Sequence, residues 1–479
     1  MTGCNGVIFR MFRSVTNRNQ ILSLLYIAVF VVSAALRLGL ALVNREAFDD
    51  HIGVVNLILQ TNKLPETPDC SECFQPKLFY FIDAAAIRMA DINLDHENSI
   101  IIATQLLNFF AGEIILVLAY LLIRQIQLDH HRIGLITFVL VAFNPALIAA
   151  NSMASNDTFA ILFSSLAVYF CWLFLKNSKM LYLFISGILV AMGIATKTNI
   201  WATALAIFLV LIVKGIKEKS SIGTLSAFAF LLGVSIVTFL NPLGQYLVNL
   251  QKYGTPITLN VVKEPFPLFF EKTYVRRPGI LSIQDGIFTF KFIDLLEYPR
   301  LTLGTTDYPA HRTSLWTDVY ASANSVHFYN SPDSWHTPPD FNVSRDIFVL
   351  ALVPAALLLF GVVSGWINLL RAVFGASNNM LINRSYGLFD IVFIGYIVFI
   401  VMLALQYRDF STMKAIYIYP AIISFVVLFL EAATTFNSLD VKHGKWIQSL
   451  FAIIIAFLII MYIVDASQMF AHLYALNMK

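Results

Sequence analysis

The sequence contains little charge for its length. Only 13% of its 479 residues are Asp, Glu, Lys or Arg, which is about half of what soluble domains usually carry. The net charge is +3, and the basic residues form no cluster of the kind that a nucleic-acid-binding surface requires. With 58% hydrophobic residues and 41 Phe, the composition indicates a polytopic membrane protein that does not bind nucleic acid.

Cysteine is also scarce. Of the four cysteines, Cys4 and Cys171 are isolated, whereas Cys70 and Cys73 form the motif Cys-Ser-Glu-Cys. No second Cys/His pair stands at a spacing suited to zinc, so we expect no metal site. In an oxidising compartment this pair can form a small disulfide, and two free thiols are the alternative.

The sequence lacks a cleavable signal and an internal repeat. Three arginines precede an apolar run of more than twenty residues, whereas a signal core has roughly 7–15. We therefore expect this run to be the first membrane span. The absence of paired halves argues against a secondary transporter, since many of these contain repeats.

Long apolar runs are abundant. A spanning helix needs about twenty apolar residues, and this rule predicts an all-α bundle of about eleven spans. The predicted spans lie near 21–43, 100–123, 133–150, 158–175, 180–196, 198–213, 221–240, 347–370, 388–405, 415–431 and 447–464.

The distribution of Lys and Arg in the short loops predicts that the N-terminus is inside. The segments 44–99 and 241–346 and the turn at 155–157 then lie outside. Residues 78–90 mix apolar and charged side chains, which suits a helix on the membrane surface or one packed on the bundle. The second external segment is rich in aromatic residues, which predicts an ordered cap.

Several short motifs follow one another along the chain. They are 48–53 (Phe-Asp-Asp-His-Ile-Gly), 75–80 (Gln-Pro-Lys-Leu-Phe-Tyr), 144–145 (Asn-Pro), 155–159 (Ser-Asn-Asp-Thr-Phe), 193–198 (Gly-Ile-Ala-Thr-Lys-Thr) and 408–420, which holds Arg-Asp-Phe and Lys-Ala-Ile-Tyr. In this order, over roughly residues 20–430, they resemble motifs of the GT-C glycosyltransferases that use polyprenyl-phosphate sugars. The nearest families are the protein O-mannosyltransferases and the aminoarabinose and galacturonic acid transferases. The chain departs from them at Gln75, where His is frequent, and at Lys77, where a second Pro is frequent.

This resemblance implies a GT-C-like module over residues 1–431, followed by a cytoplasmic loop, a last helix and a tail over 432–479. It also implies that a sugar moves, with inversion, from a polyprenyl- or dolichyl-phosphate carrier to an acceptor outside the membrane. The acceptor is a protein, a lipid or a glycan. We expect no cofactor beyond this co-substrate. The expected location is a bacterial or archaeal cytoplasmic membrane with the site facing outward, or a lumen-facing endoplasmic reticulum membrane, with membrane lipids around the chain.

The matched motifs supply the candidate acidic residues. Asp49 is the expected general base, because a carboxylate within reach can take the acceptor's proton; the alternative is an acid that only caps or solvates its turn. Asp50 either orients the acceptor or is a solvated neighbour. His51 either binds acceptor or is packed or solvated, and Asp157 either assists binding or caps a helix starting at Thr158.

The candidate phosphate-binding cations are Lys77, Lys197, Arg408 and Lys414. They lie on the predicted outer side, where the bias of positive charge towards the inside disfavours them. The alternative for each is snorkelling at the interface. Within the second span, Glu113 is a functional candidate by default, although a polar contact between helices is the better expectation.

Two other functions fit parts of the sequence. A transporter or flippase of lipid-linked sugars would need charged residues deep in several spans as well as a repeat. A non-catalytic membrane scaffold would keep the fold without the chemistry, and the acid at Asp49 argues against it.

Overall fold

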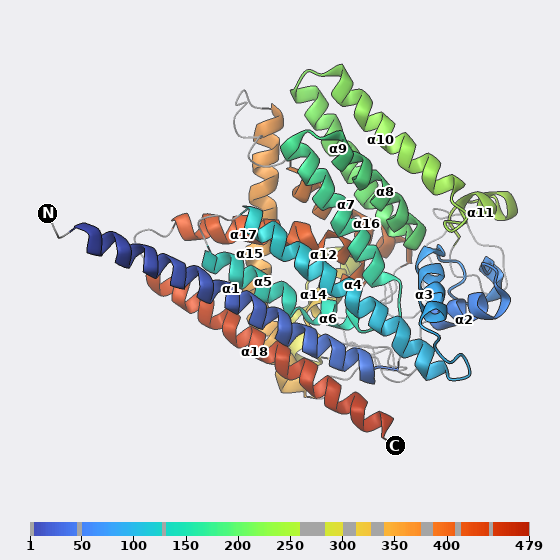
Figure 1. Ribbon diagram of the computed structural model, residues 1–479, viewed down its shortest axis with the longest axis horizontal. Coiled ribbons are helices and arrows are strands. Elements are labelled where there is room, and N and C mark those ends of the chain that lie inside the picture. Colours follow the sequence, from blue (N-terminus) through green and yellow to red (C-terminus); the bar gives the residue numbers. More distant parts are fainter. Residues whose placement is uncertain are drawn as a thin grey trace.

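The computed structural model describes residues 4–45, 50–126, 131–258, 283–299, 313–326, 340–374, 387–407, 413–439 and 444–478. Every regular element in these ranges is helical, which confirms the predicted all-α class. Many short helices join a smaller number of long ones (Figure 1).

The long helices supply the bundle, and the short ones lie in its connections. The longer elements are α1 (Cys4–Val43), α4 (Glu97–Ile126), α5 (His131–Ala142), α7 (Asp157–Asn177), α8 (Met180–Thr196), α9 (Trp201–Lys217), α10 (Ser221–Leu240), α15 (Phe341–Phe374), α16 (Leu388–Tyr407), α17 (Ile422–Leu439) and α18 (Gly444–Asn477). The shorter ones are α2 (His51–Thr61), η1 (Thr67–Asp69), α3 (Leu78–Met89), α6 (Pro145–Asn151), η2 (Thr198–Ile200), α11 (Tyr246–Tyr253), α12 (Ile283–Phe288), α13 (Phe292–Glu297), α14 (Leu315–Ala323), η6 (Ala415–Tyr417) and η7 (Tyr419–Ala421).

The chain is a multi-pass membrane protein. Among the described residues, nine helices are long and apolar enough to cross a membrane, and a bent pair of helices raises the number to ten. This is fewer than the eleven spans predicted, because α8 is a shorter apolar helix and α5 and α6 meet at a 50° bend. Each of the eleven predicted segments nevertheless contains a helix.

The bend between α5 and α6 follows from the sequence Asn144-Pro145. Proline disfavours the helical conformation of the residue before it, so α5 stops and a new helix begins. Pro145 is the first residue of α6, and the Asn144 side chain caps this helix by accepting a hydrogen bond from the Leu147 amide at 2.9 Å. The bend places the turn between α6 and α7 at the end of the bundle.

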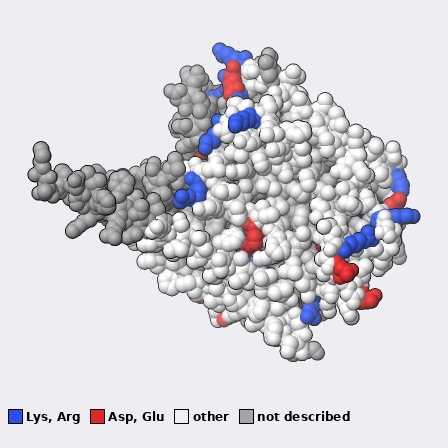
Figure 2. Space-filling view, viewed as in Figure 1, with Lys and Arg blue, Asp and Glu red and all other residues white. Residues whose placement is uncertain are grey.

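Burial separates a central helix from peripheral ones. The apolar window of α7 is 83% buried, against 22% for that of α1. Helix α7 packs against α4 and α8, whereas α1 lies alongside α18 at one edge of the molecule (Figure 1). The C-terminal helix is therefore packed on the N-terminal one. The face seen in Figure 2 is almost uncharged over a broad area, and its charges gather mainly near the rim, as expected of a surface that contacts lipid.

The two helices of the first external loop stand at one side of the bundle, near α11 (Figure 1). Helix α3 packs against α2, α4 and α8. One face of α3 is buried, including Phe79 and Asp83, while Phe81 and Met89 on the other face are exposed. The predicted helix over 78–90 is confirmed, and it is packed on the bundle along one face.

Inside the bundle, a charged pair connects α1 and α4. The guanidinium of Arg37 is fully buried, donates to the Ala142 carbonyl at 2.7 Å, and lies 3.9 Å from a carboxylate oxygen of Glu113. Glu113 therefore makes the contact between helices that was expected of it. Its partner was not predicted, although a lone arginine within the first apolar run was a signal.

Candidate active site

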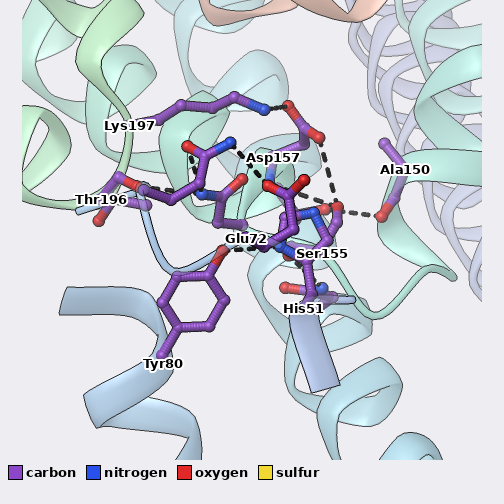
Figure 3. Close-up of polar contacts among 12 residues, drawn as sticks. His51, Glu72, Tyr80, Ala150, Ser155, Asp157, Thr196 and Lys197 are labelled. Atoms are coloured by element: carbon purple, nitrogen blue, oxygen red, sulfur yellow. Dashed lines mark hydrogen bonds and ion pairs between the residues drawn. The ribbon is translucent and has the colours of Figure 1, made fainter. Parts of the chain in front are cut away.

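The turn between α6 and α7 carries the first candidate acid. Asp157 is the first residue of α7, and its Oδ1 lies 2.5 Å from the Nζ of Lys197, which directly follows α8. The side chains are 17% and 10% exposed. Figure 3 shows the two side chains pointing toward each other across the ends of their helices. In a largely buried pair of this kind, loss of either partner would leave an uncompensated charge, so the two side chains depend on each other.

A dense set of hydrogen bonds fixes this turn. Asn108 in α4 donates to the carbonyls of Met153 and Ser155, at 2.6 and 2.8 Å. The Thr158 hydroxyl donates to the Ala150 carbonyl at 2.8 Å. Asn156 donates to the Thr196 carbonyl at 3.2 Å, joining the start of α7 to the end of α8. The acid and its lysine are thus held from three helices.

A segment near the C-terminal end of the chain, at Tyr417, also contacts Lys197. The Nζ of Lys197 lies 5.6 Å from the centroid of the Tyr417 ring, within the range of a cation–π contact. Tyr417 ends η6, and Lys414 immediately precedes this helix. Lys197 therefore contacts the short helix η6, which directly follows the predicted cation position Lys414.

The first external loop approaches this turn from another direction. Cys70 and Cys73 form a disulfide, which decides between the alternatives left open by the sequence. The side chain of Ser71 donates to Asp50 at 3.0 Å. Gln75 donates to Glu72 at 3.2 Å and accepts a long hydrogen bond of 3.4 Å from Asn156. The loop thus contacts both Asp50 and the α6–α7 turn.

The candidate histidine is packed rather than open to solvent. His51 is 4% exposed, its Nδ1 lies 2.7 Å from the Tyr80 hydroxyl, and the two rings stack. Tyr80 points from α3 toward His51, which begins α2 (Figure 3). The pair connects these two helices beside the candidate acids.

Lys77 is fully buried at the start of α3. Its Nζ donates to the carbonyls of Cys73 and Gln75. Burial lowers the pKa of this ammonium to about 7, which carboxylates at Glu72 and Asp69 partly oppose. Both hydrogen bonds are made to carbonyls of the loop directly before Lys77, so the ammonium is bonded to its own part of the chain.

Two predicted residues lie outside the described part of the chain. These are the candidate base Asp49 and the candidate phosphate ligand Arg408. In the second external segment, the indole of Trp316 donates to the Ile287 carbonyl at 2.7 Å. Across the described ranges, no group of three His, Cys, Asp or Glu side chains could hold a metal ion.

The structure adds residues that the sequence did not single out. Ser71 and Tyr417 contact Asp50 and Lys197 directly, and Asn108 donates to the turn that precedes Asp157. Asn156 stood within a matched motif, but no role was predicted for it. Serine and tyrosine at such positions carry no sequence signal of their own, because only the folded chain brings them to their partners.

Part of this chain is similar to a known protein family. Residues 91–253 match the family model of the dolichyl-phosphate-mannose-protein mannosyltransferases. This match confirms the predicted resemblance over a segment that includes α4, the α6–α7 turn and Lys197. No curated protein matches the chain.

Three solved structures, of two proteins, resemble this chain in overall structure. An oligosaccharyltransferase from Archaeoglobus fulgidus is 13% identical, with a TM-score of 0.47, over 92% of this chain and 55% of that one. ArnT from Cupriavidus metallidurans is 14% identical, with a TM-score of 0.37, over 89% of this chain and 79% of that one. A second ArnT structure, bound to undecaprenyl phosphate, is 12% identical, with a TM-score of 0.37, over 87% and 78%. The chain thus spans about half the length of the oligosaccharyltransferase.

Proposed function

We propose that this protein is an integral-membrane glycosyltransferase that moves a sugar from a polyprenyl-phosphate carrier to an acceptor outside the membrane. The observation that carries the proposal is the family match over residues 91–253, which contains the paired Asp157 and Lys197 at the helix ends. A cation held at the end of apolar helices is suitably placed to meet a phosphate whose lipid tail lies between those helices.

The reaction breaks the bond between the sugar C1 and the phosphate oxygen, and forms a bond between C1 and the acceptor's oxygen or nitrogen. The acceptor's proton passes to Asp49, and the polyprenyl phosphate leaves with the bonding electron pair. Attack opposite the phosphate inverts the anomeric centre. Cations stabilise the charge that develops on the leaving phosphate, and Lys197, Arg408 and Lys414 are assigned this role.

The ion pair gives Asp157 a part in this scheme. At 2.5 Å from Nζ, its carboxylate fixes the direction of the Lys197 ammonium before a donor arrives. An ammonium carries three donors, so the same group can contact Asp157 and a phosphate together. Asp157 thus orients the cation, while Asp50, after the base in the chain, orients the acceptor. Lys77 and His51 support the loop and the two helices around it.

The test uses purified protein in detergent with a panel of short-chain polyprenyl-phosphate sugars, and follows the release of polyprenyl phosphate. We expect release by the wild type with one donor sugar and a loss of about a thousandfold in Asp49→Asn, because general-base catalysis contributes roughly that much. Equal release by both proteins would remove Asp49 from the mechanism. If no donor is consumed even with protein, lipid and glycan acceptors present, the transferase proposal is wrong.

The side of the membrane is a separate part of the proposal. The external placement of 44–99 and 241–346 follows from the loop charges, and the disulfide at Cys70–Cys73 is typical of an oxidising compartment. Cysteines introduced at Thr61 and at Lys217 should react with an impermeant maleimide from opposite sides of sealed vesicles. Labelling from the same side would refute this orientation.

A further inference from the structure

The disulfide closes a tight turn in the first external loop. The Cα atoms of Cys70 and Cys73 are 5.0 Å apart, and the Cys73 amide donates to the Cys70 carbonyl at 3.3 Å. Cys73 is buried, so one end of the turn is anchored in the core. Two residues, Ser71 and Glu72, lie between the cysteines, and their side chains contact different parts of the molecule.

Ser71 holds Asp50. Its hydroxyl and its amide both donate to Oδ2 of Asp50, at 3.0 and 3.3 Å. The other carboxylate oxygen lies over Gly53, where an added Cβ would be 2.0 Å away. Asp50 is thus fixed between the turn and the first turn of α2, and it directly follows the proposed base.

Glu72 connects the turn to the other side of the candidate site. It accepts from Gln75 at 3.2 Å, and Gln75 in turn accepts from Asn156 at 3.4 Å. Asn156 directly precedes Asp157, and its side chain donates to the carbonyl of Thr196, which directly precedes Lys197. The second residue of the turn is therefore connected to the oriented cation.

Lys77 is hydrogen-bonded to the buried side of the turn. Its buried ammonium donates to the carbonyls of Cys73 and Gln75, and its amide donates to the Leu243 carbonyl at 2.6 Å. The turn is thereby attached to the start of the second external segment. The disulfide adds a covalent link across Ser71 and Glu72, the two residues that make these contacts.

We propose that the Cys70–Cys73 turn is a positioning element that sets the acceptor side of the site, through Ser71 and Asp50, against the phosphate side, through Glu72, Gln75 and Asn156. The proposal rests on the proposed function for its chemical meaning. The step that it controls is proton transfer to the base, which needs atoms placed within a few tenths of an ångström. Opening the disulfide should therefore lower kcat more than it changes the donor KM.

The first experiment requires no activity. Hydrogen exchange is measured on the full chain in detergent, in a Cys4→Ser, Cys171→Ala background where only one cysteine pair remains. Reduction of that pair, or its replacement by Cys70→Ser and Cys73→Ser, should increase exchange both at residues 50–56 and at residues 155–158. Unchanged exchange at either segment would overturn the proposal, since the turn would then not connect the two sides.

The second experiment separates positioning from general stability. Ser71→Ala should lower kcat about tenfold with the donor KM within about twofold, as expected for lost hydrogen bonds to a carboxylate, and Ser71→Thr should restore most of it. Thr61→Ala removes a hydroxyl from the other end of α2 and should leave both constants unchanged. Equal kcat in wild type and Ser71→Ala would overturn the proposal. A wild type inactive with every donor would refute the transferase function, while the exchange experiment would still decide whether the turn links the two segments.

Discussion

The two sides of the candidate site are held by different means. The phosphate side, around Asp157 and Lys197, is formed by the ends of membrane helices and fixed by several short hydrogen bonds from α4 and α7. The acceptor side, around Asp50 and His51, lies in a surface loop held by a disulfide, a serine and one tyrosine. Under the proposed function, a lipid-borne donor would meet the preformed side, and the acceptor would meet the side attached by fewer contacts.

The difference has a physical reason. Helix ends in the membrane have few conformations and little water, so a buried ion pair there keeps one geometry. A loop gains order only from specific contacts, each contributing about 1 kcal/mol. Variants on the phosphate side should therefore change donor binding and the chemistry together, whereas variants on the acceptor side should act mainly on kcat.

Among the variants that compare the two sides, the largest expected effect is at Lys197. Lys197→Met removes the oriented cation and leaves Asp157 without its partner, so we expect kcat/KM for the donor to fall about 100-fold or more. Lys197→Arg should retain part of the activity, because the positive charge remains. The measurement is the initial rate of polyprenyl phosphate release over a range of donor concentrations.

A matched control exists at the other end of α9. Lys214 and Glu218 form a pair with the same 2.5 Å separation, away from the proposed site. Lys214→Met should leave kcat/KM within about twofold, because this pair joins a residue of the last turn of α9 to the residue after that helix, away from the proposed site. If Lys197→Met and Lys214→Met had the same modest effect, Lys197 would have no role at the phosphate.

The second prediction concerns Asp83 and pH. Burial raises the pKa of this carboxyl to about 7, and the hydrogen bond from Thr104 opposes the shift only partly. The folded pKa is above the unfolded one, so the folded state binds the extra proton between about pH 4 and 7. The stability that this group contributes is fully present below the unfolded pKa and is lost as pH rises through about 7. Each unit of difference corresponds to about 1.4 kcal/mol.

Asp83→Asn tests this dependence of stability on pH, because it keeps the shape of the side chain and removes its charge. The variant should have a higher thermal midpoint than wild type at pH 8 and a similar one near pH 4.5, measured in detergent by unfolding scans. Asp91→Asn, at an exposed position after α3, is the control and should change neither midpoint. A wild type whose stability rises between pH 5 and 8 relative to Asp83→Asn would contradict the prediction.

The sequence predicted the parts of this molecule that depend on composition and local order. Apolar runs predicted the positions of the long helices, and the matched motifs supplied Asp157 and Lys197 as candidates. The bend at Asn144-Pro145 was not predicted, because the apolar run over 133–150 was interpreted as one span. It did not predict the contacts of Ser71, Asn108 or Tyr417, because hydrogen bonds between segments far apart in the chain leave no periodic pattern. It also left Lys77 as a phosphate candidate, because nothing in the sequence indicates that its ammonium is buried against its own loop.

The third prediction tests how the phosphate side is held. Asn108→Ala removes two donors and leaves the carbonyls of Met153 and Ser155 without them, which should cost about 1–3 kcal/mol of stability. It should also raise the donor KM by several-fold, because the turn carrying Asp157 loosens. Gln125→Ala removes a single amide donor to Tyr169 near the opposite end of the same helix. This control should lower the thermal midpoint less and leave the donor KM unchanged, and an equal effect of both variants on KM would exclude a specific role for Asn108.

The smallest expected effect is on the acceptor side, at Tyr80. Tyr80→Phe keeps the stacked ring and removes the hydroxyl that lies 2.7 Å from His51, so we expect a loss of about 0.5–1.5 kcal/mol. Because the pair connects α2 to α3 on the acceptor side, kcat should fall a few-fold and the donor KM should stay constant. Tyr169→Phe is the matched control, since it loses a comparable hydrogen bond remote from the site. A rise in donor KM in Tyr80→Phe would show that the two sides are not held independently, and the comparison drawn between them would fail.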